Sequence, residues 1–332
     1  MSSWAPGSIA QYECYISRWM SYCKDHSIDP FAAHFSEGIE FLSDLYLSSE
    51  LRYSAVNTAR SALSSLLPKR DGISFGKDHR VSRLLKGIFR LRPALPKYTV
   101  TWDVSLAFLC FIDLHRRGDI SRKVMTMKLS LLLGLLAGQR SQTLSKLDLE
   151  YMFLDSSKAI FYFPSLLKTS RPTFHQAPLE FKAFPFNPAL CPVKAIKEFL
   201  HCTNRIEKKS IVGPLFISYA SPFKPVKSAT IARYIREMLL LAKIDISSFS
   251  AHSVRGASTS AANRRNLSIS DICKAAGWSS CKTFATFYNK DVATKNFGEE
   301  VLLSCDSVAL VVQESQSAAS IVEHDHGGYA MI

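Results

Sequence analysis

The stretch FSAHSVRGASTSAANRRNLSISDICKAAGWSSCKTFATFYNK, residues 249–290, guides the interpretation of the whole chain. It contains His252 and Arg255, which are three residues apart and therefore share one face of a helix. Trp278 and Tyr288 follow, the latter among aromatic neighbours. The spacing of apolar residues and caps predicts three helices here, at residues 251–264, 268–276 and 282–288.

Taken alone, these residues are weak evidence for a catalytic site. A two-residue pattern such as His-x-x-Arg recurs by chance in a chain of 332 residues. A single tyrosine or tryptophan is far more often part of a core than of an active site. The rest of the chain must therefore supply the other residues of any such site.

Arg140 follows a strongly apolar helix predicted over residues 128–137. A guanidinium at the end of a buried helix is costly unless an anion meets it. An internal salt bridge to Asp148 or Glu150 is an equally good explanation. Position alone does not choose between a bound anion and an internal ion pair.

A β-hairpin is predicted between residues 159 and 181, with strands at 159–164 and 173–181. Its connecting loop carries Lys168 and Arg171. A lysine at the tip of a hairpin is usually no more than a solvated charge. Further helices are predicted at residues 103–116, 142–149, 192–201 and 230–243.

The first ninety residues predict a small all-helical domain, with helices at residues 9–24, 36–47, 53–67 and 78–90. The segment Arg92-Pro-Ala-Leu-Pro-Lys97 cannot continue a helix, because it holds two prolines in four residues. We therefore predict a helical domain at 1–92, a linker at 93–101, a second domain at 102–300 and a tail at 301–332.

The formal charge of +13 is unevenly distributed. Residues 1–50 hold two basic and seven acidic side chains, whereas residues 60–97 hold ten basic and two acidic ones. Concentrated positive charge is commonly used to contact phosphates, although a solvated helix face is the alternative. The charge does not distinguish DNA, RNA or an acidic protein as the partner. The candidate binding residues on the last helix of this region are Arg80, Arg83, Lys86 and Arg90.

Other features exclude several classes of protein. No uninterrupted run of 18 apolar residues occurs, and the first residues lack the pattern of a secretory signal, so we expect a soluble, intracellular protein without a membrane partner. The eight cysteines form no CxxC pair and are expected to be reduced thiols. No Gly-rich phosphate loop, GxSxG or HExxH motif occurs, so nucleotide hydrolase, serine hydrolase and zinc protease functions have no support.

The ordered set of candidate residues resembles the tyrosine recombinase (phage integrase) family. The matching blocks are LLLGLLAGQRSQTLSKLDLE, LLKTSRP, AHSVRGASTSAA and AGWSSCKTFATFYNK, within residues 105–295. The residues of these blocks are most similar to those of recombinases of eukaryotic mobile elements, the DIRS-like and Crypton groups. The resemblance implies a mainly α fold with a small β-hairpin or sheet, in which a helical core-binding domain precedes an α+β catalytic domain.

The resemblance also implies a chemistry. Tyr288 would attack a DNA phosphodiester to give a 3′-phosphotyrosine link and a free 5′-hydroxyl. Arg140 and Arg255 would bind the non-bridging oxygens, and Lys168 would protonate the leaving oxygen. His252 would donate to the phosphate or assist the tyrosine, and Trp278 would donate its indole N–H. Neither a metal nor another cofactor is implied, because the bond energy is kept in the phosphotyrosine.

Double-stranded DNA is the implied partner, bound by a homodimer or tetramer, in the nucleus if the host is eukaryotic and otherwise in the cytoplasm. Two departures from the family pattern stand out. Thr143 occupies a position that is usually acidic, so either Gln142 or Asp148 would orient Arg140 instead, or the site would react more slowly. Ten residues separate Trp278 from the tyrosine, a slightly longer spacing than in many bacterial relatives. A non-catalytic DNA-binding descendant and a type IB topoisomerase are the alternative interpretations.

Overall fold

The computed structural model describes residues 6–48, 51–93, 98–118, 120–167, 170, 176–203, 212–278 and 280–292. The chain divides into two compact units, Met1–Lys97 and Tyr98–Ile332. Lys168, Arg171 and the tail 301–332 lie outside the described residues, so their predicted roles stay predictions. No helix in the described ranges is long and apolar enough to cross a membrane.

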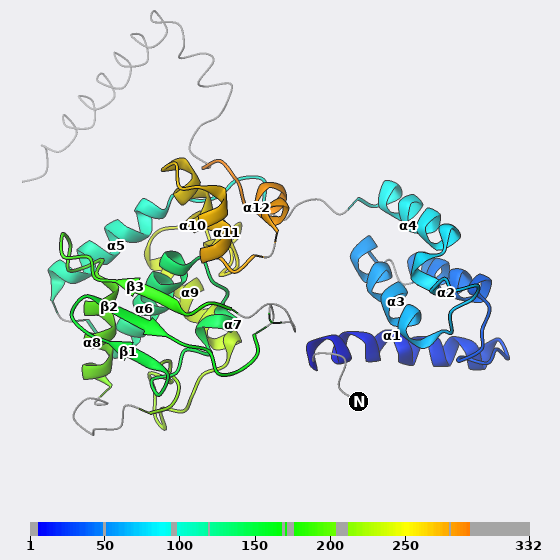
Figure 1. Cartoon of the computed structure of the whole chain (residues 1–332), viewed down its shortest axis with the longest axis horizontal. Coiled ribbons are helices and arrows are strands. Elements are labelled where there is room, and N and C mark those ends of the chain that lie inside the picture. The colour runs from blue at the N-terminus through cyan, green and yellow to red at the C-terminus, as the bar shows by residue number, and fades with distance from the viewer. Residues whose placement is uncertain are drawn as a thin grey trace, which may run out of the picture. The chain divides into compact units, whose positions relative to one another are not determined.

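The first unit is all-helical, as predicted (Figure 1). Its core forms where the apolar faces of four helices meet, and Trp19, Phe41, Phe75 and Leu63 are almost completely buried in it. The indole of Trp19 also donates a 3.0 Å hydrogen bond to the carbonyl of Pro30. The elements are α1 (Pro6–Asp25), α2 (Phe35–Ser48), α3 (Tyr53–Leu66), the 3-10 turn η1 (Phe75–Lys77) and α4 (His79–Leu91).

Helix α4 has two chemically distinct faces. Asp78 caps its first turn by accepting from the backbone N–H of Arg80, and Val81, Leu85 and Ile88 bury the apolar face. The opposite face exposes the four basic residues predicted to contact nucleic acid, which are Arg80, Arg83, Lys86 and Arg90.

The second unit surrounds helix α6 (Arg122–Ala137), which is buried along almost its whole length. It begins six residues earlier than predicted, because Ser121 accepts a hydrogen bond from the Val124 N–H and caps it there. Around it pack α8 (Pro192–Cys202), α9 (Ser228–Leu241) and α10 (Ser253–Arg264), while α5 (Val104–Arg117) also contacts α10 (Figure 1).

A three-stranded antiparallel sheet of order β1-β2-β3 lies on one side of this helical core (Figure 1). Its strands are β1 (Met152–Leu154), β2 (Lys158–Phe161) and β3 (Leu179–Lys182). Phe161 pairs with Leu179, so β2 and β3 form the predicted hairpin and flank the loop that carries Lys168. The prediction missed β1, which is only three residues long and pairs with β2.

The predicted helix at 142–149 is wrong beyond its first turn. Helix α7 spans only Ser141–Leu144. The following residues leave the helix to pair with a distant segment, since Leu149 N–H donates to Gly213 and Leu215 N–H donates to Leu147. Those backbone groups are thereby satisfied by a tertiary contact, which local helix propensity does not reveal.

The chain described ends with α10, α11 (Ile269–Ala275) and α12 (Cys281–Phe287), close to the three predicted helices. Gly277, with φ +65°, provides the left-handed turn after α11. Tyr288 is the C-cap of α12 rather than its last helical residue.

Candidate active site

Arg140 leaves the buried helix α6 at a sharp turn. Gly138 ends α6 with φ +56°, and a Cβ there would lie 3.3 Å from Thr259 of α10, so glycine allows both the turn and the close approach. Arg140 is then extended and forms the N-cap of α7. No ion pair joins its half-buried side chain to Asp148 or Glu150. The internal salt bridge considered from the sequence is therefore wrong.

Arg255 is the most unusual charged residue described. Only 1% of its surface is exposed. Its Nη2 donates a 2.6 Å hydrogen bond to the Ala276 carbonyl, whereas Nε and Nη1 are buried with no hydrogen-bond partner among the described residues. Burial, and next the positive charge of Arg140, lower the pKa of Arg255 to about 10. A buried guanidinium with two unused donors creates a site for an anion.

The tyrosine and the histidine predicted from the sequence are in contact. The Tyr288 hydroxyl lies 3.2 Å from Nε2 of His252, which precedes α10 as its N-cap. The Tyr288 ring lies 4.6 Å from the Trp278 ring, and the guanidinium carbon of Arg255 lies 5.6 Å from the Tyr288 ring centre. The structure therefore brings three of the predicted residues, His252, Trp278 and Arg255, together around the phenol of Tyr288.

Trp278 packs directly against the buried arginine. The guanidinium carbon of Arg255 lies 4.3 Å from the indole ring centre, within the range of a cation–π contact. The indole Nε1 is buried and has no hydrogen-bond partner in the described ranges. Together with Arg255, this side chain presents a third N–H group without an acceptor.

The backbone around Tyr288 is held by the same unit. Ser260 donates from Oγ to the Tyr288 carbonyl at 2.6 Å and accepts from the Lys290 N–H at 3.0 Å. One residue further on, the Thr101 N–H donates to the Asp291 carbonyl at 2.8 Å. The backbone from Tyr288 to Asp291 is thus held by α10 and by the segment that precedes α5.

These residues adjoin an open pocket of about 510 Å³. Arg140, His252 and Arg255 line it, together with two residues that the sequence did not single out, Arg233 and Arg236 of α9. Arg233 forms a long ion pair with Glu237, at 3.8 Å, whereas Arg236 forms none among the described residues. The only available signal was the polar face of the predicted helix 230–243, and such a face looks the same whether it meets water or a ligand.

Thr143 and Gln142 bear on how Arg140 is oriented. Thr143 is buried, and its N–H donates to the Arg140 carbonyl at 2.9 Å, so it shapes the turn through the backbone. Gln142 lines the same pocket, but no hydrogen bond joins its side chain to Arg140. Neither Gln142 nor Asp148 orients the guanidinium directly in this state.

The pocket is suited to a tetrahedral oxyanion. Four arginines from three segments converge on it, and a planar guanidinium offers paired donors to two oxygens of a phosphate. The histidine that contacts the tyrosine lines the same pocket, so a bound anion and the phenol would be neighbours.

Neither a protein-family model nor a curated protein sequence matches the chain. Solved structures do. The integrase of transposon Tn1549, in complex with transposon right end DNA, aligns with a TM-score of 0.56 and 13% identity over 90% of this chain and 92% of its own. The XerH site-specific recombinase bound to its difH substrate, before cleavage, aligns with a TM-score of 0.53 and 13% identity over 85% and 74%.

The post-cleavage complex of XerH gives a TM-score of 0.50 at 14% identity, over 76% of this chain and 67% of its own. At such low identities the likeness establishes the fold. The mainly helical architecture with a small sheet is that of the tyrosine recombinases, and the predicted fold class is confirmed.

Proposed function

Starting from a chain with the fold of the tyrosine recombinases, we propose that this protein breaks and rejoins DNA through a covalent 3′-phosphotyrosine at Tyr288. The observation that carries the proposal is Arg255, a buried guanidinium with two unpartnered N–H groups beside the tyrosine. Keeping such a group in a fold is costly, and an anion bound in the pocket offsets that cost.

The scissile phosphate would occupy the pocket between Arg140 and Arg255. As the phenol oxygen of Tyr288 bonds to phosphorus, negative charge grows on the non-bridging oxygens. The guanidiniums of Arg140 and Arg255, which line the pocket, would supply donors at that point. Trp278 packs against Arg255 and would add its indole N–H, which has no partner among the described residues.

Proton transfer in this scheme has two ends. His252, 3.2 Å from the Tyr288 hydroxyl, accepts the phenolic proton as the new P–O bond forms. The bond to the 5′-oxygen breaks, and we assign its protonation to Lys168 on the hairpin loop. Reversal of these steps, with a 5′-hydroxyl as the nucleophile, rejoins the strand and regenerates the free tyrosine.

DNA affinity would come largely from exposed cations outside the pocket. Arg83, Lys86 and Arg90 on the basic face of α4 are candidates, as is Arg171 on the hairpin loop. Arg80 is the weakest candidate, since its guanidinium already pairs with Asp78 at 3.1 Å. The XerH and Tn1549 integrase structures are DNA complexes, which supports double-stranded DNA as the partner.

Assembly as a dimer or tetramer on DNA belongs to the same proposal. The residues of the sequence motifs support an origin in a eukaryotic mobile element, and with it a nuclear location. Imaging of a tagged full chain in eukaryotic cells checks the location, and cytoplasmic retention contradicts it.

The decisive experiment measures covalent attachment. A duplex is first selected from a random pool by binding to the full chain, and then offered with single nicks placed across the bound region to trap the intermediate. We expect an SDS-resistant protein–DNA adduct that is lost in Tyr288→Phe while duplex binding is retained. Tyr162→Phe is the matched control, since that tyrosine is exposed at the end of β2.

The competing hypothesis, a non-catalytic DNA-binding protein, predicts a different result from the same assay. It is supported if the chain binds the selected duplex tightly and no nick position yields an adduct. An adduct that persists in Tyr288→Phe would contradict the assignment of the nucleophile. Failure to select any duplex would contradict both functions.

A further inference from the structure

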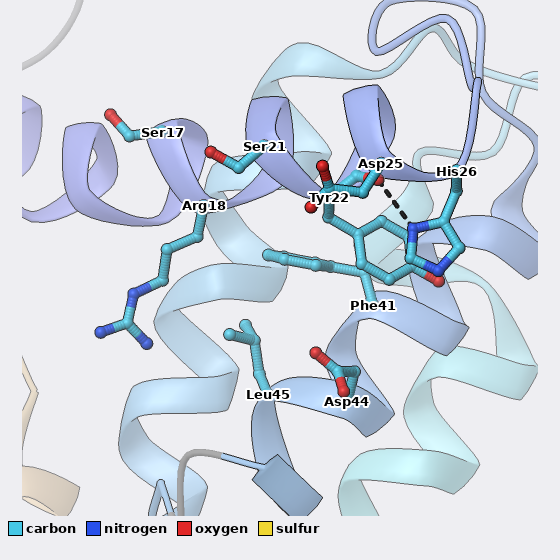
Figure 2. Close-up of a pocket in the computed structure, with 9 residues that line it drawn as sticks. All are labelled: Ser17, Arg18, Ser21, Tyr22, Asp25, His26, Phe41, Asp44 and Leu45. Carbon is cyan, nitrogen blue, oxygen red and sulfur yellow. Dashed lines mark hydrogen bonds between the residues drawn. The ribbon is translucent and has the colours of Figure 1, made fainter.

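An open groove of about 660 Å³ runs between α1 and α2 of the first unit, far in sequence from the candidate active site (Figure 2). Its floor is apolar, formed by the ring of Phe41 and the side chain of Leu45, with the half-buried Tyr22 beside them. The acidic balance of residues 1–50 makes this face unsuitable for DNA. The groove therefore belongs to a different kind of contact from the arginine pocket.

The charges of the groove are separated along its length. Figure 2 shows Arg18 at one end and Asp25 and Asp44 at the other. Neither Arg18 nor Asp25 forms an ion pair with another described residue. The carboxylate of Asp44 accepts a hydrogen bond from the hydroxyl of Ser48, at 2.6 Å, and forms no ion pair with a described residue. Both ends thus present charge that the described part of the unit leaves uncompensated.

The α1 residues that line the groove stand at positions symmetric about its midpoint, between Ser21 and Tyr22, and the two charges at matching positions are opposite. At that midpoint the small side chain of Ser21 adjoins the large side chain of Tyr22. Arg18 and Asp25 are equidistant from it, as are Ser17 and His26 at the outer positions. A sequence with this arrangement is complementary to itself when two helices run antiparallel.

We propose that the groove receives helix α1 of a second copy of this chain, in an antiparallel pair around a two-fold axis. Arg18 then faces Asp25 of the second copy, Ser21 faces its Tyr22, and Ser17 faces its His26. Because a two-fold interface uses the same patch on both partners, each of these contacts occurs twice.

Packing, in addition to charge, supports helix α1 of a second copy as the occupant of the groove. The small side chain of Ser21 leaves room for a tyrosine ring at the crossing point, where two helices approach to about 8–10 Å. Helix α1 is 20 residues or about 30 Å long, so a second helix can lie along it rather than touch it at one point. Phe41 and Leu45 would be covered by the same helix.

A charge exchange tests the pairing in the full chain without DNA, so its outcome is independent of the proposed recombinase function. Sedimentation equilibrium at low ionic strength gives the dimer dissociation constant. Arg18→Glu and Asp25→Arg should each raise it at least tenfold, because each places like charges opposite one another twice. The double variant Arg18→Glu with Asp25→Arg should return it to within about threefold of the original.

A cysteine pair tests the register. Ser21→Cys places two thiols close to the two-fold axis, and mild oxidation should join two chains at that position. Ser17→Cys, on the same face, is the matched control, because its copies would lie about 13 Å apart along the helices. The unmodified chain measures the background from the exposed Cys14 and Cys281.

Three results would overturn the proposal. They are a chain that stays monomeric at the highest concentrations reached, a double variant that associates no better than the single ones, and equal crosslinking at positions 17 and 21. In the last two cases the chain pairs through another surface, and the groove does not receive α1 of a second copy. Thermal melting of each variant verifies that these exposed substitutions leave the fold intact.

Discussion

The two positively charged regions of this protein are built in opposite ways. In the second unit, Arg255 is buried under Trp278 with unused donors, and Arg140 converges on the same pocket. In the first unit, Arg83 and Lys86 project from α4 into solvent. Both regions are positively charged, but Arg255 is enclosed by protein whereas the side chains of Arg83 and Lys86 are exposed.

This difference separates two uses of positive charge. Exposed cations are screened by salt and add affinity without fixing geometry. A buried cation is costly to desolvate, and a bound anion offsets that free energy. Such a cation can also stabilise negative charge that develops in a reaction. We therefore assign catalysis to the pocket and affinity to α4, an assignment that the following substitutions can break or sharpen.

The largest effect is expected in the pocket. Arg140→Ala and Arg255→Ala should each slow single-turnover adduct formation on the order of 100- to 1000-fold, about 3 kcal/mol, because each removes donors that meet the developing charge. Arg255→Lys should recover little, since an ammonium lacks the planar fork. Duplex affinity should change less than tenfold.

Arg117→Ala is the control for these variants, because Arg117 is exposed and paired with Asp113 at 2.6 Å. Equal losses in affinity and rate for Arg140→Ala would mean that the pocket contributes only binding. Thermal melting in the presence of sulfate gives a second measurement, and stabilisation by the anion should disappear in both pocket variants.

A smaller effect within the pocket distinguishes its two newly identified arginines. Arg236→Ala should reduce adduct formation about tenfold, since its guanidinium has no ion-pair partner among the described residues and is available to DNA. Arg233→Ala should have less effect, because Glu237 already neutralises part of its charge. The same single-turnover assay compares them, and a larger loss for Arg233 would reverse the interpretation.

The sequence predicted the elements of the fold well because most of them carry a clear period. The four helices of the first unit and α5, α6, α8 and α9 of the second each bury one apolar face or lie wholly in the core. Strand β1 and the end of α7 were not predictable in the same way. Strand β1 has only three residues, too few for an apolar period, and it forms by pairing with the adjacent strand β2. The segment after α7 leaves the helix because it pairs with residues 213–215, which are distant in sequence.

The candidate active site could likewise be predicted only in part from the sequence. The residues His252, Arg255 and Tyr288 could be named from spacing and resemblance, and they do lie together. Arg140 and Trp278 each follow a glycine in a left-handed turn, Gly138 and Gly277, and the sequence does not reveal which tertiary neighbour such a turn leads to. Arg236 could not be named, because nothing in a polar helix face indicates which tertiary neighbour it meets.

Lys128 is a second buried cation, outside the candidate active site. It lies in α6, is 1% exposed, and burial lowers its pKa. The unfolded chain then holds this proton more tightly, so the charged lysine destabilises the fold at pH 7 and the penalty fades as pH rises toward the ordinary lysine pKa. Lys128→Met should raise the free energy of unfolding at pH 7 on the order of 1 kcal/mol.

Chemical denaturation at pH 7 and pH 10 measures that change, and the gain should shrink at the higher pH. Adduct formation should be unaffected, in contrast to the pocket arginines. A loss of stability on removing this charge would mean that Glu198, whose charge raises the pKa of Lys128, compensates the ammonium more fully than its burial suggests.

The smallest effects are expected on α4, where the comparison is between neighbours on one helix face. Arg83→Ala and Lys86→Ala should each lower duplex affinity a few-fold and flatten the plot of log affinity against log salt concentration by about one unit. Arg80→Ala should change the slope less, because the guanidinium of Arg80 already pairs with Asp78. All three should leave the rate of adduct formation at saturating duplex unchanged. Unaltered slopes in Arg83→Ala and Lys86→Ala would remove α4 from the DNA interface and contradict the assignment of affinity to that helix.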